Sequence, residues 1–406
     1  MSMESTIHEL AMPVADWVTV ADLVADPYPV YARLRDEMPV AWVPAVKKVL
    51  ITRFEDCTAA ERNPDVFSSQ MATAPMMTGM AGRPMIRKDG AEHAAERKAV
   101  SGALRPRTVN ARWTETFRAN THKYLSRLAE IGPDEAELNR DFSAPVASQN
   151  LMDLIGFKGV SVEDFAEWSA AFMAGNANGP GDEEVWDRCE RARAAANAAL
   201  DEVLPYLRDN PDETLASIML QHNMPEESVR VNLFLAISGG VSEPKHTISN
   251  SVLLLDEHPH FRPPTSLKHG EPDYDEAWRK IFHETVRYYT PIAMTTRETK
   301  VVSEMRGVQI PPGTQIGIVL ASGNRDERAF IEPNTFNPQR AEVQHLAFGE
   351  GAHMCAGMWV ADAEVGRIAV PALYERFPNF RIDRRRPLEW EGWIFRGMKS
   401  TPVTWG

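Results

Sequence analysis

The chain has 406 residues, 43% of them hydrophobic, which is enough for a large buried core and lies at the upper end for one continuous domain. A formal net charge of -13, with no basic stripe of interleaved aromatic residues, argues against a nucleic-acid partner. Three scattered cysteines exclude a disulfide framework and are typical of a cytoplasmic protein, and no segment approaches the ~20 apolar residues that cross a membrane.

The N-terminal part combines a short helix, a predicted strand pair and an unusual apolar segment. Residues 27–35 form an amphipathic helical pattern, and residues 40–52 alternate and carry β-branched residues, which predicts a hairpin of two strands. Residues 71–85 hold five methionines without helical or strand periodicity, so we predict a loop. Surface loops are seldom this apolar, and methionine suits adaptable binding surfaces.

His93 and Arg97 follow in a helical pattern. Their i, i+4 spacing puts both side chains on one helix face, where two donors can hold a single anionic group. A solvated helix face without a ligand is the more common alternative, and the two residues alone do not decide between them.

The pattern from residue 108 to 241 indicates one helix after another. Neither an internal repeat nor a linker rich in proline, glycine or serine divides the chain. We therefore predict a mainly α fold with a small β part, organised as a single domain over residues 1–406.

Residues 231–247 begin as a helix that is apolar on nearly all sides, which indicates burial. Gly239, Gly240 and Pro244 then interrupt it, at about 1 kcal/mol per glycine and about 3 kcal/mol for the proline. Such a cost in a buried helix indicates function, because missing side chains admit a ligand and a kink opens a groove. Glu243 is costly to bury unless it is paired, so it is either a proton relay or part of a salt bridge that holds this helix.

A second charged pattern follows the central helix. Glu284 and Arg287 lie at i and i+3 on one helix face, and Arg340 comes later in the chain. An exposed pair of this kind contributes only ~0.3 kcal/mol, and most such pairs are exposed. Arg297 lies between them in a stretch, residues 291–302, that we expect to be extended.

Cys355 lies in a glycine-rich turn that leads into a helical pattern. Backbone N–H groups in so tight a turn point at one sulfur and stabilise a thiolate, which makes the sulfur a candidate metal ligand. A lone cysteine is more often a small buried hydrophobe, and a cysteine near a histidine can be a nucleophile. Neither alternative explains five positions within ten residues as one unit: Phe348, Gly351, His353, Cys355 and Gly357.

This unit closely resembles the haem-binding signature of the cytochrome P450 superfamily, whose cysteine thiolate is an axial ligand of the haem iron. The resemblance runs from about residue 20 to the end and implies the α-rich haem-thiolate monooxygenase fold with one haem b. It implies that His93, Arg97 and Arg297 hold the haem propionates. Within the cysteine loop, it makes His353 and Phe348 further cofactor contacts.

The same resemblance implies roles for the other patterns. It makes Glu284, Arg287 and Arg340 a buried structural charge cluster beneath the haem, and residues 71–85 the loop that covers the substrate pocket. Residues 231–247 resemble the central helix above the haem, where O2 is activated. The chain returns to strands over residues 380–405, where Phe395 is a candidate substrate contact or, equally, a packing aromatic.

The central helix departs from the family pattern. Most relatives carry an acid followed by threonine after the two glycines, whereas this chain has Ser242, Glu243 and Pro244. That resembles a bacterial subgroup that includes the haem domains of self-sufficient monooxygenases and certain aromatic O-demethylases. The chain has no cysteine run for an iron–sulfur cluster. We therefore expect electrons from a ferredoxin and a flavin reductase, or from a fused reductase that this chain lacks.

We predict a monooxygenase that uses O2 and two electrons to hydroxylate or O-dealkylate a small apolar or aromatic substrate. Cys355 is then the axial ligand of the metal, Gly239 and Gly240 make room for O2, and Ser242 with Glu243 orders water for proton delivery. One alternative is a haem-thiolate enzyme that uses peroxide or rearranges an oxygenated substrate. The other is a haem-binding sensor or carrier, which gives no reason for an acid beside a glycine groove.

Overall fold

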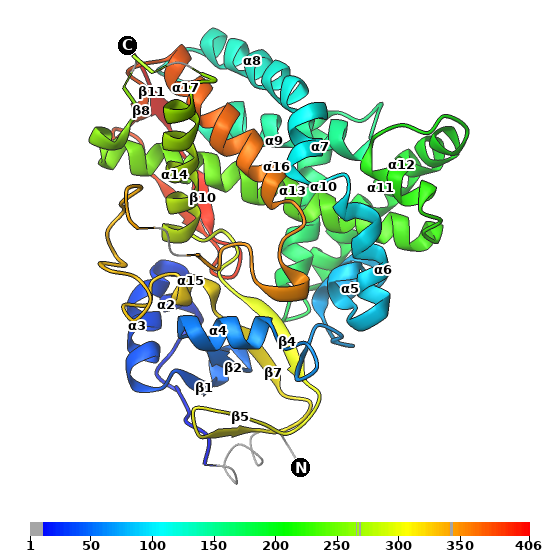
Figure 1. Cartoon of the computed structure of the whole chain (residues 1–406), viewed down its shortest axis with the longest axis vertical. Coiled ribbons are helices and arrows are strands. Elements are labelled where there is room, and N and C mark those ends of the chain that lie inside the picture. Colours follow the sequence, from blue (N-terminus) through cyan, green and yellow to red (C-terminus); the bar gives the residue numbers. More distant parts are fainter. Residues whose placement is uncertain (1–10, 265, 268, 342–343) are drawn as a thin grey trace.

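The computed structural model describes residues 11–264, 266–267, 269–341 and 344–406. Helices dominate one part of the molecule, and the largest sheet lies in a smaller part below them in Figure 1. The α-helices are α2 (Val20–Ala25), α3 (Pro27–Glu37), α4 (Phe54–Glu61), α5 (Pro75–Met80), α6 (Gly90–Ser101), α7 (Pro106–Arg112), α8 (Thr114–Ile131), α9 (Ala144–Ile155), α10 (Val162–Ala177), α11 (Glu183–Asp209), α12 (Leu215–Gln221), α13 (Glu226–Glu257), α14 (Pro272–Tyr288), α15 (Leu320–Gly323), α16 (Met358–Ala361) and α17 (Val370–Arg376).

Shorter segments complete the helical part. The 3-10 turns are η1 (Pro44–Val46), η2 (Met85–Arg87), η4 (Pro259–Phe261) and η5 (Gly351–His353), and the π-helical segments are η3 (Asn139–Ser143) and η6 (Asp362–Ala369). The strands are β1 (Val40–Val43), β2 (Lys48–Ile51), β3 (Phe67–Ser68), β4 (Thr295–Thr299), β5 (Ser303–Met305), β6 (Val308–Ile310), β7 (Gln315–Ile318), β8 (Arg381–Ile382), β9 (Glu389–Glu391), β10 (Gly397–Ser400) and β11 (Val403–Thr404). The predicted mainly α fold with a small β part is confirmed.

The largest sheet joins distant parts of the chain. Its strand order is β1-β2-β7-β4-β3, with β2 parallel to β7 and the other pairs antiparallel. The hairpin predicted over residues 40–52 is the β1–β2 pair, in which Val40 lies opposite Ile51. Three smaller pairs, β5–β6, β8–β11 and β9–β10, include the strands predicted near the C-terminus.

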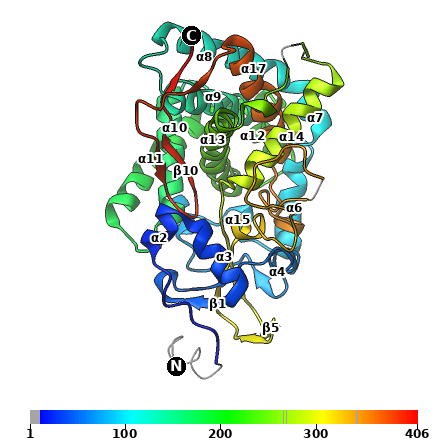
Figure 2. The same cartoon turned by 90° about the vertical axis from the view of Figure 1, so that its left-hand side faces the viewer.

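Helix α13 is the central element of the helical part. It lies in the middle of the surrounding helices in Figure 2 and packs against α9, α10, α12 and α14. Its apolar side chains enter two hydrophobic cores, one shared with α9 to α12 and one shared with α14, η6 and α17. The prediction of a buried central helix is confirmed, since most of its residues from Val229 to Leu255 are buried.

The loop predicted over residues 71–85 is wrong in one respect. Pro75 begins the short helix α5, where its missing N–H is tolerated, and Met76, Met80 and Met85 are buried in the first core. Helix α5 packs against α10 and α11. Packing against these distant helices, which the local sequence does not encode, overrides the absence of helical periodicity.

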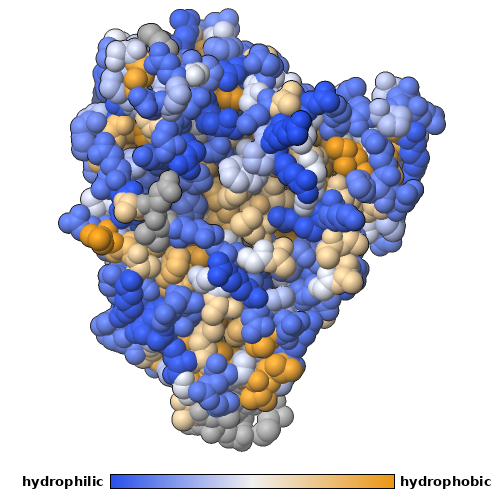
Figure 3. Space-filling model, in the orientation of Figure 1, coloured by the Kyte–Doolittle hydropathy of each residue, from blue (hydrophilic) through white to orange (hydrophobic). Residues whose placement is uncertain are grey.

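The surface is largely polar. Figure 3 shows hydrophilic residues over most of this face, with apolar residues gathered mainly near its middle and towards its lower edge. Within the described residues, none of the helices has the length and apolar character needed to cross a bilayer.

Candidate functional site

The cysteine loop is closed by its own backbone. The N–H of Cys355 donates to the carbonyl of Phe348 at 2.8 Å, and Gly349 and Gly351 both adopt a φ of 66°. Glycine is the residue that takes this left-handed conformation without strain. Gly351 is also confined by space, because a Cβ there would lie 2.9 Å from the carbonyl oxygen of Glu61. The two glycines therefore fix the tight turn that carries the cysteine.

The sulfur of Cys355 is accessible and yet has protein around it. This surrounding protein desolvates the thiol and raises its pKa. Backbone N–H groups of Gly357 and Met358 act in the opposite direction and stabilise the thiolate. The charge of Arg97 also lowers this pKa, while that of Glu243 on α13 raises it. An accessible sulfur with converging N–H groups suits a metal-bound thiolate.

Two histidines lie together beside the cysteine loop. The rings of His93 on α6 and His353 on η5 have centroids 4.1 Å apart. His353 Nε2 lies 3.0 Å from a carboxylate oxygen of Asp89, and burial lowers the pKa of His353 to about 4. Arg97, one turn after His93, donates to the carbonyl of Met354 at 2.5 Å. The predicted histidine and arginine face of α6 is thus turned towards the cysteine loop.

Arginines from the sheet side complete this cationic group. Arg297 on β4 is buried and paired with Glu61 of α4, with N–O distances of 3.0 and 3.1 Å. The charge of Arg297 lowers the pKa of both His93 and His353, so the three groups are electrostatic neighbours. Arg87, at the end of η2, is also buried near Arg297.

This arrangement fits the carboxylates of a haem. Iron protoporphyrin IX carries two propionates, and the cationic group is not neutralised by the protein alone. Among the described residues, Arg97 donates to a backbone carbonyl and not to a carboxylate, and Nε of the neighbouring buried Arg87 has no hydrogen-bond partner. Buried guanidinium donors without carboxylate partners cost free energy, so a ligand with carboxylate oxygens suits this place.

Helix α13 forms the other side of the site. It continues through Gly239 and Pro244 without a break, although proline cannot donate to the carbonyl of Gly240 four residues earlier. A Cβ on Gly239 would lie 3.6 Å from Glu243 Oε1, so the carboxyl lies beside this glycine. A Cβ on Gly240 would meet Leu151 of α9 at 2.7 Å, which gives this glycine a role in close helix packing.

Glu243 is the unusual group on this helix. It is surrounded by protein, and desolvation raises its pKa to about 8, with only a small opposing effect of Lys245. Its Oε2 is buried without a partner within the described part of the chain. Thus the structure gives no support to the salt-bridge alternative, and the carboxyl is largely protonated at neutral pH. Ser242 is half-buried beside it in the sequence.

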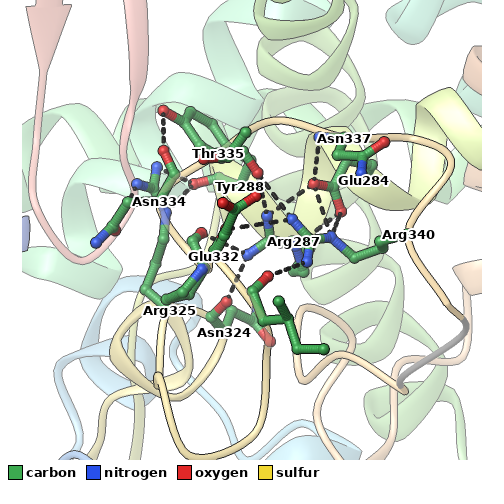
Figure 4. A network of polar contacts seen from close by, with 12 residues as sticks. Glu284, Arg287, Tyr288, Asn324, Arg325, Glu332, Asn334, Thr335, Asn337 and Arg340 are labelled. Carbon is green, nitrogen blue, oxygen red and sulfur yellow. Dashed lines mark hydrogen bonds and ion pairs between the residues drawn. The ribbon is translucent and has the colours of Figure 1, made fainter.

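The predicted charge cluster forms a closed network, drawn in Figure 4. The carboxylate of buried Glu284 accepts from Arg287 at 2.7 Å, from Arg340 at 2.9 and 3.0 Å, and from the N–H of Asn337 at 2.8 Å. Arg287 also donates to the carbonyl of Asn324 at 2.8 Å. The cluster holds α14 to the segment that precedes the cysteine loop.

The structure therefore brings together most of the residues predicted from sequence. His93, Arg97, Arg297 and His353 surround one side of the Cys355 loop, while Phe348 supplies its carbonyl to the turn and packs its ring near Phe282.

Sequence reasoning missed three charged residues of this site. Glu61 pairs with Arg297, Asp89 orients His353, and Arg87 is the additional buried cation. Asp89 occupies the N-cap position of α6, where it has the appearance of an ordinary cap, but its side chain makes no cap hydrogen bond. An arginine directly after an apolar, methionine-rich segment was the available signal for Arg87.

Comparisons with known proteins agree with this geometry. Residues 278–378 match the family model of Cytochrome P450. The chain is 29% identical to Cytochrome P450 107B1 of Saccharopolyspora erythraea, over 92% of this chain and 93% of that protein. It is 26% identical to Methyl-branched lipid omega-hydroxylase of Mycobacterium tuberculosis, over 99% of this chain and 96% of that protein.

The fold is also that of a solved structure. The structure of CYP109E1 from Bacillus megaterium in complex with testosterone superposes with a TM-score of 0.82 at 22% identity. The match covers 96% of this chain and 100% of that one.

Proposed function

We propose that this chain, a member of the cytochrome P450 family of haem b monooxygenases, would hold the haem iron through the thiolate of Cys355 and that Glu243 would supply protons to the reaction. The observation that carries this proposal is an accessible cysteine sulfur in a glycine turn, near enough to Glu243 of α13 for that carboxyl to raise the thiol pKa when ionised, while the carboxyl itself has no partner for Oε2 among the described residues and a pKa raised to about 8. His93, Arg97, Arg297 and His353 hold the propionates.

Bound haem supplies the iron at which O2 is reduced by two electrons and the substrate is oxidised. The chain supplies the protons that this reduction consumes. Glu243, with a pKa of about 8, holds a proton at neutral pH and gives it up from a carboxyl oxygen beside Gly239. Ser242 is one residue away and can order the water that reprotonates it.

The groups around Cys355 influence the protonation state of its sulfur, which is the proposed metal ligand. Backbone N–H groups of Gly357 and Met358 lower the pKa of the Cys355 thiol, and so does the charge of Arg97. These contributions oppose the burial that raises this pKa, and a bound metal ion would favour the thiolate further. The turn fixed by Gly349 and Gly351 keeps the sulfur in place, and Arg97 supports it by donating to the carbonyl of Met354.

The substrate is a small apolar or aromatic molecule that the enzyme hydroxylates or O-dealkylates. Support comes from the apolar walls offered by the methionine-rich segment and by Leu235 and Ala236, which are only partly buried on α13. A relative that covers nearly the whole chain is named for hydroxylation of a methyl-branched lipid. Electrons come from a ferredoxin and a flavin reductase, or from a reductase of the fused kind found in part of the subgroup that the Ser242-Glu243-Pro244 pattern resembles.

The ligand assignment is tested by spectroscopy. Reduced protein under carbon monoxide should show the strongly red-shifted Soret band of a thiolate-bound haem, and Cys355→Ala should abolish it. Cys189→Ala, a change at a buried cysteine in the helical core, is the matched control and should keep the band. Persistence of the band in Cys355→Ala would contradict the assignment.

The reaction class is tested by the source of oxidising equivalents. Turnover with NADH and a ferredoxin system supports the monooxygenase, while turnover with peroxide alone supports the peroxide-using alternative. A screen of apolar and methoxy-aromatic compounds for displacement of iron-bound water identifies the substrate class. Formaldehyde release from a methoxy compound distinguishes O-dealkylation from hydroxylation.

A further inference from the structure

Arg87 differs from the other buried arginines of the described chain. Three of them, Arg35, Arg287 and Arg297, are paired with carboxylates. Arg325 lies 3.6 Å above the ring of Tyr288, and Arg396 lies 5.0 Å above that of Trp390. These partners offset the loss of hydration that burial imposes on a guanidinium. Arg87 has neither a carboxylate pair nor an aromatic ring among the described residues.

The contacts of Arg87 are to neutral atoms. Nη1 donates to the carbonyl of Thr296 at 3.3 Å, and Nη2 donates to its hydroxyl at 3.1 Å. Nη1 also lies 3.6 Å from the sulfur of Met71, and Nε is buried without a partner. Thr296 belongs to β4 beside Arg297, and Met71 begins the methionine-rich segment. Arg87 therefore lies where the cationic group meets the wall of the proposed substrate pocket.

The electrostatic surroundings of Arg87 are unfavourable. Burial and repulsion from Arg297 lower its pKa to about 10, and its own charge lowers the pKa of Lys48 on β2. Asp89 is the nearby acid that acts in its favour, but that carboxylate is already bound to His353, Ser68 and Lys300. A buried cation without its own counter-charge is strongly destabilising.

We propose that Arg87 binds a carboxylate of a ligand that lies beside Thr296 and Arg297 of β4. Its planar guanidinium offers paired N–H donors that match a carboxylate, which a lysine does not. Two sources have this chemistry, a propionate of the haem and a carboxylate on the substrate itself. The inference deepens the proposed function and rests on it, since both sources belong to a haem enzyme.

Two variants and two measurements test the proposal. Arg87→Gln and Arg87→Met remove the charge, and Arg83→Gln is the control because Arg83 is exposed and paired with Glu92. The rate of haem transfer to apomyoglobin reports on the propionates. Titration with long-chain acids and with their methyl esters, followed by displacement of iron-bound water, reports on a substrate carboxylate.

Each source predicts its own result. If Arg87 holds a propionate, the variants should release haem roughly tenfold faster, with the preference for acids over esters unchanged. If it holds the substrate, binding of the acids should weaken roughly tenfold, with ester binding and haem release unchanged. Arg83→Gln should match the wild type in both measurements.

Two results would overturn the proposal. One is folded variants that match the wild type within twofold in both measurements. The other is failure of both variants to fold as apoprotein, judged by circular dichroism with Arg83→Gln intact, because Arg87 would then serve the fold and not a ligand. A wild-type protein that lacks the thiolate-haem band would instead contradict the proposed function itself.

Discussion

The charge cluster around Glu284 and the residues around Cys355 differ in whether their buried polar groups have hydrogen-bond partners. In the cluster, Glu284 accepts hydrogen bonds from Arg287 and Arg340, and Arg287 also donates to backbone carbonyls. In the described structure, neither residue has a buried polar atom without a partner. Around the cysteine, by contrast, Glu243 Oε2 and His353 Nδ1 have no hydrogen-bond partner among the described residues. Arg97 and Arg87 donate to uncharged groups there and not to a carboxylate.

This difference distinguishes residues that stabilise the fold from residues that await a ligand. A closed network needs nothing further and stabilises the arrangement of segments that it joins. Open groups cost free energy in the protein alone, so they indicate where a cofactor, a proton or a substrate completes the site. Charge content alone does not make the distinction, since both regions contain glutamate and arginine.

The largest expected effect comes from opening the closed network. Glu284→Ala leaves Arg287 and Arg340 buried or half-buried without their carboxylate, so the free energy of unfolding should fall by about 3–5 kcal/mol. Urea unfolding of the haem-loaded protein, followed by circular dichroism, measures this change.

Glu276 provides the matched control on the same helix. It is largely solvated and lies close to Arg279 and Lys280, so Glu276→Ala should lower the free energy of unfolding by less than about 0.5 kcal/mol. Equal effects of the two substitutions would mean that the buried network is no more important than a surface pair.

The contrast also explains what could be predicted from the sequence. The Cys355 turn is contiguous, and the spacing of His93 and Arg97 is a property of one helix, so both were recognisable without tertiary structure. The mainly α fold and the burial of α13 followed from periodicity and from its apolar surface.

Features that depend on distant segments were not predictable in this way. Glu61 and Arg297 are 236 positions apart, and Asp89 and His353 are 264 positions apart, so no local pattern links them. Helix α5 forms because α10 and α11 cover it. The close approach of Gly240 to Leu151 is likewise a contact that only packing of α9 against α13 creates.

An intermediate effect is expected from removing the proton of Glu243. Glu243→Gln keeps the size and polarity of the side chain but cannot donate an acidic proton, so product formation should slow by roughly tenfold or more. Haem content and substrate binding should be unchanged, and more of the NADH consumed should appear as hydrogen peroxide.

Glu364 offers a control with a similarly raised pKa in another part of the molecule. It is a buried carboxyl on η6 whose pKa is also raised to about 8 by desolvation, and it accepts a hydrogen bond from Asn150 at 3.1 Å. Glu364→Gln should leave the rate and the product formed per NADH as in the wild type. Unchanged rate and coupling in a stable Glu243→Gln protein would eliminate the proton relay.

The smallest expected effect is on the pH dependence of stability. Desolvation raises the pKa of both Glu243 and Glu364 from 4.5 to about 8, so between these values the folded chain keeps protons that the unfolded chain has lost. The stabilising effect of this protonation is present below about pH 4.5 and is lost as the pH rises to about 8 and beyond. Glutamine in either position removes one of these titrations.

The stability of each glutamine variant relative to the wild type should therefore increase as the pH increases. Near pH 5 the apparent melting temperatures should be close, and at pH 9 each glutamine variant should be more stable by about 1 kcal/mol or more, equivalent to roughly 1–2 °C for a large chain. The Glu284→Ala variant should show a deficit throughout this pH range, because it opens a buried network of ion pairs. A constant gap between wild type and Glu243→Gln from pH 5 to 9 would mean that this carboxyl is charged in the folded protein, and a charged Glu243 cannot hold the proton that the relay requires.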